Sequence, residues 1–130
     1  MPQSISVKTS SRVEMVDITP SVQKEVSRIG VTDGICVVYV PHTTAGITIN
    51  EGADPAVCHD VISMLNKLVP ENAGYRHMEG NSDSHIKTSI IGSSVTVIIE
   101  KGHIVLGTWQ KIFFCEFDGP RSRKVYLKTM

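Results

Sequence analysis

A histidine and two threonines follow an apolar, β-branched segment at residues 35–40. In open sheets, ligands bind just beyond the ends of strands. An imidazole there offers acid–base or metal-binding capacity, and hydroxyls offer hydrogen bonds. We therefore expect His42 to act in catalysis or metal binding, and Thr43 and Thr44 to contact a substrate. The alternative is an ordinary turn whose threonines satisfy backbone groups.

Two further histidines lie in and just after a long polar segment at residues 70–82. His77 lies inside it, and Asn81 and His85 follow at four-residue intervals. Long loops in small domains often carry function, so Asn81 is a candidate substrate contact. The spacing of the two histidines is not itself a zinc motif. If His42, His77 and His85 converge in space, they would suit a divalent metal, with imidazole favouring Zn²⁺ over Mg²⁺. Otherwise they are unrelated loop histidines that make hydrogen bonds.

Three other polar groups are candidates for the same chemistry. Asn50 and Glu51 precede a predicted helix start, where an anionic substrate group can also bind. Both are candidates for metal or substrate contact, and Glu51 is also a candidate for catalysis. The alternative for Glu51 is a solvated loop carboxylate. Trp109 and Gln110 come shortly after a glycine, and both are candidates to line a pocket. The alternative for Trp109 is packing in the core or at a subunit interface. Arg121 lies in a Gly-Pro turn, where a rigid guanidinium suits a phosphate or a surface ion pair.

Two segments have the start and stop residues of helices. The first begins with Thr19 as a predicted cap and Pro20 in the first turn, and it ends at Gly30. The second begins at Asp54 followed by a proline and ends before Pro70. Apolar residues recur at helical spacing in both.

The remaining apolar segments predict strands. Residues 35–40 look like a central strand buried on both faces. The last four strands are expected to pair in chain order, beginning with a hairpin across Lys101 and Gly102. Residues 84–91 suit a helix or a strand, and their flanking residues favour the helix. The pattern predicts an α+β fold in one domain spanning residues 1–130. The predicted strands are 5–9, 12–18, 35–40, 47–49, 95–100, 103–106, 108–117 and 124–128.

The composition excludes several classes of partner. Thirteen basic and thirteen acidic residues give a net charge of zero, so no general nucleic-acid partner is expected. Neither a signal-peptide pattern nor an apolar run long enough to span a bilayer is apparent, so no membrane is expected. An odd number of widely spaced cysteines (three) does not suggest a disulfide framework. We therefore expect a cytoplasmic protein.

Three segments together resemble one known family. They are HTTAGITINEGADP at 42–55, the H-x3-N-x3-H run from His77 to His85, and the segment 94–121, which contains GTWQ and ends in FCEFDGPR. In these motifs the chain is similar to the YjbQ family, also called secondary thiamine-phosphate synthase proteins. The resemblance covers essentially the whole chain.

The resemblance implies a fold of β-sheet layers packed with helices, assembled as a homotrimer with sites near subunit boundaries. It also implies a transferase that joins a pyrimidine diphosphate to a thiazole phosphate and releases pyrophosphate. A divalent metal or arginines must then neutralise the leaving group. Arg121 is the first candidate, followed by Arg123 and Lys87. The chain has no carboxylate-rich Mg²⁺ motif.

Two alternatives to the transferase remain open. One is a non-catalytic trimer that binds a phosphorylated metabolite or a metal. The other is a metal-dependent hydrolase in which His85 or His77 is a ligand or a general acid–base group. Under the transferase and hydrolase hypotheses the partner is a phosphorylated small molecule.

Overall fold

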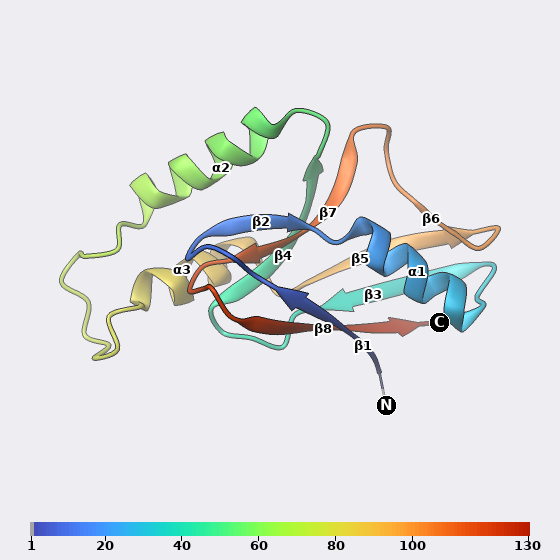
Figure 1. The fold of residues 1–130 in the computed structure, drawn as a ribbon, viewed down its shortest axis with the longest axis horizontal. Helices are drawn as coiled ribbons and strands as arrows, with labels where there is room; N and C mark the ends of the chain where they lie inside the picture. The colour runs from blue at the N-terminus through green and yellow to red at the C-terminus, as the bar shows by residue number, and fades with distance from the viewer. Residues whose placement is uncertain (1) are drawn as a thin grey trace.

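Two antiparallel sheets and three helices make up the computed structural model, which describes residues 2–130 (Figure 1). The predicted α+β class is confirmed. Among these residues, no helix is both long and apolar enough to cross a membrane. The elements are β1 (Gln3–Lys8), β2 (Glu14–Asp17), α1 (Thr19–Ile29), β3 (Gly34–Tyr39), β4 (Ala45–Glu51), α2 (Pro55–Leu68), α3 (Ser82–Ile91), β5 (Ser94–Glu100), β6 (His103–Val105), β7 (Gln110–Glu116) and β8 (Ser122–Thr129).

Strand order differs from chain order. One sheet has the order β1-β8-β3-β5-β6 and the other β2-β7-β4. The predicted β5–β6 hairpin is confirmed, but the expected pairing of the last four strands in chain order is wrong. β7 lies between β2 and β4, and β8 lies between β1 and β3.

The burial of β7 gives the physical reason. Ile112 and Phe114 face a core shared with α1 and the five-stranded sheet. Phe113 and Cys115 face the opposite way, into a cluster that includes Leu65 of α2. A strand that buries both faces needs a layer on each side, so β7 occupies the middle of the molecule.

β3 is the central strand of its sheet, as predicted, but only one of its faces is buried. Cys36 and Val38 are fully buried, whereas Tyr39 is 47% exposed. The expectation of burial on both faces is therefore wrong for the single chain. Helices and the second sheet cover only the inner face of the five-stranded sheet, so its outer face has no covering layer among residues 2–130.

The helix ends follow local rules with one exception. Asp54 caps α2 by accepting a hydrogen bond from the Ala56 N–H at 2.9 Å, and Gly30 ends α1 at a φ of 85°, both as predicted. Thr19 does not cap α1. Its hydroxyl instead accepts a hydrogen bond from the Ile112 N–H at 2.8 Å, which ties the helix to β7.

The segment between α2 and α3 contains no helix or strand, and α3 is the helix that the flanking residues favoured. The buried side chains of α3 are polar: Asp83, Ser84, Lys87 and Thr88. Arg12 and Lys87 both contact Asp83, which holds the helix against the β1–β2 connection. α3 therefore has a fixed position from which it presents its remaining side chains.

Candidate functional site

A cavity of about 440 Å³ opens where three parts of the chain meet. The β3–β4 connection, the start of α3 with the loop before it, and the β7–β8 connection form its walls. These three parts meet because the start of β4 pairs with the end of β7, where Ala45 lies opposite Glu116. The first residues of β8 lie beside that pair, although β8 belongs to the other sheet. The cavity is lined by Pro41, His42, Thr43, Thr44, His77, Glu79, Asn81, His85, Asp118, Arg121 and Arg123.

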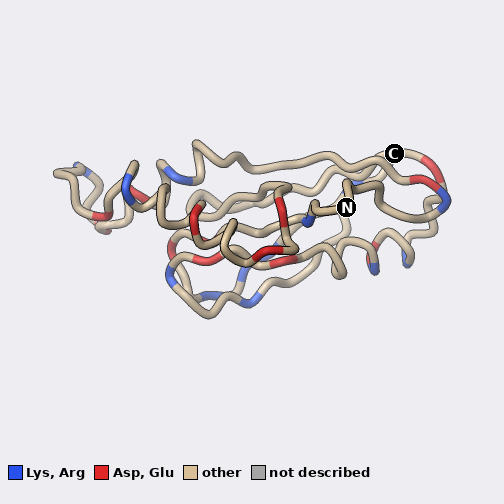
Figure 2. Tube along the Cα trace, turned by 90° about the horizontal axis from the view of Figure 1, so that it is seen from above, with Lys and Arg blue, Asp and Glu red and all other residues tan. Residues whose placement is uncertain are grey.

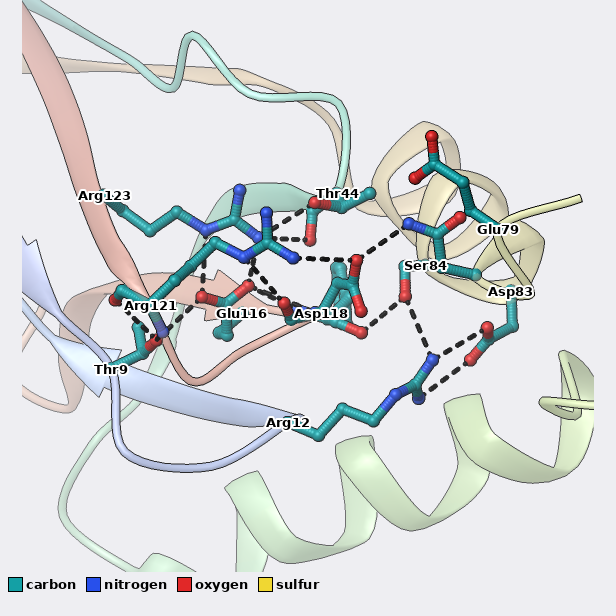
Figure 3. A network of polar contacts seen from close by, with 12 residues as sticks. Thr9, Arg12, Thr44, Glu79, Asp83, Ser84, Glu116, Asp118, Arg121 and Arg123 are labelled. Atoms are coloured by element: carbon teal, nitrogen blue, oxygen red, sulfur yellow. Dashed lines mark hydrogen bonds and ion pairs between the residues drawn. The ribbon is translucent and has the colours of Figure 1, made fainter.

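Arg123, which lines this cavity, forms a buried ion pair with Glu116 (Figure 3). The Glu116 side chain is fully buried and the Arg123 side chain is 3% exposed. Arg123 donates from Nε at 2.9 Å and from Nη2 at 2.5 Å. Burial raises the pKa of Glu116, but hydrogen bonds from Arg123, Thr9 and a backbone N–H outweigh it and keep the pKa below its usual value. The carboxylate is therefore ionised and holds the guanidinium in one orientation.

One nitrogen of the Arg123 guanidinium remains available. Nη2 also donates to the Thr44 hydroxyl at 2.9 Å. Nη1 has no hydrogen-bond partner within residues 2–130, and the residue lines the cavity. A fixed guanidinium with a free N–H group is a strong donor for an anion.

Arg121 lies at the mouth of the cavity and is half exposed. It donates to the Asp118 carbonyl from Nε at 2.9 Å and to the Asp118 carboxylate from Nη2 at 3.1 Å. Asn81 donates to the same carboxylate at 2.8 Å, so Asp118 links the β7–β8 turn to α3. The turn requires Gly119, since a Cβ there would lie 2.5 Å from the Ser11 carbonyl oxygen.

His42 is oriented by the backbone of β8. Its Nε2 accepts a hydrogen bond from the Lys124 N–H at 3.0 Å. A neutral imidazole that accepts at Nε2 carries its proton on Nδ1. Burial lowers the pKa of His42, and the positive charge of Arg123 lowers it further. His42 is therefore a neutral residue whose Nδ1–H is a donor.

His77 and His85 form an edge-to-face pair, with ring centroids 5.3 Å apart and an angle of 87° between the rings. Nε2 of His77 lies 4.0 Å from the Glu79 carboxylate. Within residues 2–130, no group of three or more histidine, cysteine, aspartate or glutamate side chains is arranged to hold a metal ion. The predicted convergence on a metal stays a prediction.

Figure 2 shows both acidic and basic residues along the trace, and the thirteen of each kind give a net charge of zero. Any preference for an anion must therefore come from local donors. In the cavity wall, the Asp118 carboxylate already accepts from Arg121 and Asn81. Glu79 adds a second carboxylate to the lining, and the other polar groups left to face a ligand are mainly N–H and O–H donors.

The whole chain matches a known family. Residues 3–130 match the family model described as UPF0047 protein YjbQ-like. The chain belongs to the YjbQ-like UPF0047 family. It is 59% identical to a UPF0047 protein of Methanocaldococcus jannaschii, covering 95% of this chain and 90% of the relative. It is 50% identical to UPF0047 protein YugU of Bacillus subtilis, covering 100% of this chain and 99% of the relative.

Solved structures of the YjbQ/UPF0047 family have the same fold. A crystal structure of an uncharacterised family member from Clostridium acetobutylicum is 54% identical, with a TM-score of 0.96, covering 98% of this chain and 99% of the other. A hypothetical protein from Aeropyrum pernix is 37% identical, with a TM-score of 0.94, covering 100% of this chain and 98% of the other. The family resemblance of the sequence is thereby confirmed.

Seven of the residues predicted for the site of this family member share the cavity. Fold and strand order bring them together from positions up to 79 residues apart (121 − 42), since His42 and Arg121 both line the cavity. Their individual roles stay predictions. The seven are His42, Thr43, Thr44, His77, Asn81, His85 and Arg121.

Four predicted residues lie elsewhere. Glu51 pairs with Gln110 at the far ends of β4 and β7, and the Gly52 N–H donates to the Trp109 carbonyl. Asn50 is beside them. β4 separates this group from the cavity by roughly 20 Å at about 3.3 Å per residue.

Sequence reasoning missed Glu116 and Asp118, and it ranked Arg123 below Arg121. The available signal was a carboxylate inside the apolar run of β7, because a buried charge requires a partner. Lys87, a weaker candidate, is 2% exposed and contacts Asp83 and Asn66 outside the cavity.

Proposed function

We propose that the cavity binds the phosphate or diphosphate group of a small molecule. The observation that carries the proposal is the Arg123 guanidinium, which lines the cavity and is held by Glu116 with Nη1 left unpaired. The Nδ1–H of His42 supplies a second donor, and Arg121 at the mouth supplies a second positive charge. An anion there would meet preorganised donors with little reorganisation.

The reaction we propose is the transfer that the family resemblance implies, in which a thiazole phosphate displaces pyrophosphate from a pyrimidine diphosphate. The leaving group departs as an anion, and Arg123 and His42 are suited to stabilise its charge. His85, which lines the cavity together with His42 and His77, is the candidate acid–base group.

A homotrimer and a cytoplasmic location belong to the same proposal. Tyr39 and Ile98 are about half exposed on the outer face of the five-stranded sheet, as is Val105 on its edge strand. Apolar side chains on an uncovered sheet face support self-association. The group around Glu51 and Trp109 would then act from a subunit boundary. The three free cysteines are consistent with a reducing compartment.

A metal-dependent hydrolase is the second candidate, favoured by the His77–His85 pair. Two imidazoles bound to one tetrahedral Zn²⁺ have ring centroids about 5 Å apart, close to the 5.3 Å seen here. His42 does not fit the same site, because Nε2 already accepts from Lys124 and Nδ1 carries the proton. A metal bound by His77 and His85 would supply an activated water.

Pyrophosphate release from the pyrimidine and thiazole substrates tests the transferase. We expect turnover by the native chain, and a loss of roughly 10²-fold or more in His42→Ala and in His85→Ala, with folding and assembly retained. His59→Ala is the matched control, since His59 lies on α2 outside the cavity with its side chain 81% exposed. Full activity of His42→Ala would refute the assigned role.

Two further measurements separate the alternatives. Calorimetric binding of phosphate or pyrophosphate without turnover would favour the non-catalytic binder, and absence of any binding would refute the proposal. Metal analysis of protein purified without chelators, compared with a His77→Ala/His85→Ala variant, tests the hydrolase. Zinc in both preparations would contradict ligation by this pair.

A further inference from the structure

Thr9 follows β1 and lies against the β7–β8 connection, although it does not line the cavity. The residue is 4% exposed. Its hydroxyl contacts the backbone of Arg121 and the side chain of Glu116, as Figure 3 shows. A buried hydroxyl requires hydrogen-bond partners, and here the partners belong to the two parts of the site that carry its arginines. Thr9 is therefore placed to affect both arginines at once.

The Thr9 hydroxyl is one link in a chain of hydrogen bonds. Its oxygen accepts from the Arg121 N–H at 3.0 Å. It lies 2.8 Å from Oε1 of Glu116 and 3.0 Å from the Arg121 carbonyl oxygen. A hydroxyl has one proton, and the ionised carboxylate is the nearer and stronger acceptor, so the proton points to Glu116. The same Oε1 accepts from Nε of Arg123 at 2.9 Å. The chain therefore joins the backbone of one arginine to the guanidinium of the other.

The backbone near Thr9 holds the β7–β8 connection in place as well. The Thr9 N–H donates to the Arg121 carbonyl at 3.1 Å, and the Gly119 N–H donates to the Arg12 carbonyl at 3.0 Å. A Cβ at Gly119 would lie 2.9 Å from the Thr9 hydroxyl oxygen and 2.8 Å from Cγ of Glu116. Because these groups are in close contact, the connection cannot shift without breaking the hydrogen bonds to Thr9.

The contacts of Arg121 with Asp118 do not replace this link. Asp118 belongs to the same connection, so its hydrogen bonds to the Arg121 guanidinium do not fix that connection relative to β1. Loss of the Thr9 hydroxyl would leave the Arg121 N–H without this partner and would remove one donor from the fully buried Glu116 carboxylate. Donors that are free to move bind an anion less tightly, because binding must then restore their orientation.

We infer that Thr9 is a positioning residue of the anion site. Its hydroxyl fixes the two arginines relative to one another, while Thr9 itself does not touch the ligand. This inference rests on the proposed binding of phosphate in the cavity. It adds a residue from the connection between β1 and β2, whereas the residues that line the cavity come from other parts of the chain.

Calorimetry on the full chain with pyrophosphate tests this role in two matched comparisons at position 9. Thr9→Val removes the hydroxyl and keeps the shape of the side chain, and it should weaken pyrophosphate binding about tenfold or more. Thr9→Ser keeps the hydroxyl and loses a methyl group, and its affinity should stay within about threefold of the native value. Thr9→Ala differs from Thr9→Ser only by the hydroxyl, so this second comparison answers the same question if valine prevents folding.

Thr19→Val is the control for a hydroxyl with a structural role alone. The Thr19 hydroxyl accepts from the Ile112 N–H at 2.8 Å and joins α1 to β7 outside the cavity. Its removal should lower Tm, whereas the pyrophosphate affinity should stay within about twofold of the native value. If Thr9 were only structural, Thr9→Val would resemble Thr19→Val and lose stability without losing affinity.

The outcomes separate this role from the proposed function. Weak binding by Thr9→Val, with recovery in Thr9→Ser and native affinity in Thr19→Val, would support the role. Native affinity in Thr9→Val, or equal affinities in Thr9→Ser and Thr9→Ala, would overturn it and leave the phosphate site standing. Failure of the native chain to bind pyrophosphate would overturn both.

Discussion

The substitution Asp83→Asn should destabilise the fold strongly, although Asp83 lies outside the cavity. Its carboxylate is fully buried and accepts from Arg12 Nη1 at 3.2 Å, Arg12 Nη2 at 3.1 Å and Lys87 Nζ at 3.4 Å. Lys87 is 2% exposed and keeps only the neutral Asn66 oxygen, at 2.7 Å, if the charge is removed. Asparagine preserves volume, so the change isolates the loss of charge.

The magnitude follows from burial. Removing one member of a buried pair costs roughly 3–5 kcal/mol, because the partner charge stays buried without compensation. The Arg12 side chain is a third exposed, so water solvates part of its charge once the carboxylate is gone. We therefore expect a loss of about 3 kcal/mol in the free energy of unfolding, at the lower end of that range. For 130 residues the unfolding entropy is roughly 0.27 kcal/mol/K, which converts this loss to a fall in Tm of about 11 °C.

Thermal unfolding at pH 7, followed by circular dichroism, measures the effect. Asp60→Asn serves as the control, since that side chain is 83% exposed, and its Tm should change by less than about 2 °C. Adding Lys87→Met to Asp83→Asn should recover part of the loss, because it removes the uncompensated buried cation. If Asp83→Asn lowers Tm no more than Asp60→Asn does, the buried contacts of Asp83 do not hold α3 in place.

Three further predictions concern protons and anions. The pKa values of Glu116 and Asp83 in the folded chain lie below the ordinary 4.5 and 3.8, so the unfolded chain takes up protons first as pH falls. The stability that these two carboxylates give the fold is present above those values and is lost on further acidification. A Tm that stays flat from pH 5 to pH 3 would contradict this. The His42 imidazole should titrate below 6.5 by NMR, with the signal absent in His42→Ala; a midpoint at or above 6.5 would refute its depressed pKa. Arg121→Ala should weaken phosphate binding about tenfold with little change in Tm. The control Arg28→Ala, on α1, should leave phosphate binding unchanged. Equal phosphate affinities in the two variants would exclude Arg121 from the site.

Local chemistry explains which elements the sequence predicted well. Asp54 and Gly30 act on backbone groups within a few residues, so their roles can be read without knowing the fold. α3 was harder, because its buried positions hold Asp83 and Lys87 in place of an apolar stripe. A helix whose buried face is polar lacks the periodic signal on which helix prediction depends.

Strand neighbours were the main failure, and the reason is that they are not local. β7 and β8 follow one another in the chain, yet they lie in different sheets. The apolar run of β7 showed that the strand is buried but not which layers bury it. Chain order predicts strand pairing well for a sheet that has one face in solvent. It predicts pairing poorly for a strand that is buried between two layers.

The candidate site shows the same division. The sequence by itself identified the polar residues that follow β3, the histidines around the loop before α3, and the Gly-Pro turn with Arg121, because each stands out from its own neighbours. The tertiary structure decided which of them meet. Insertion of β8 between β1 and β3 brings Arg123 onto Glu116, and the extended course of β4 carries Glu51 away from His42. A strand keeps its two ends apart, whereas pairing joins segments distant in the chain, and neither effect can be read from residue types alone.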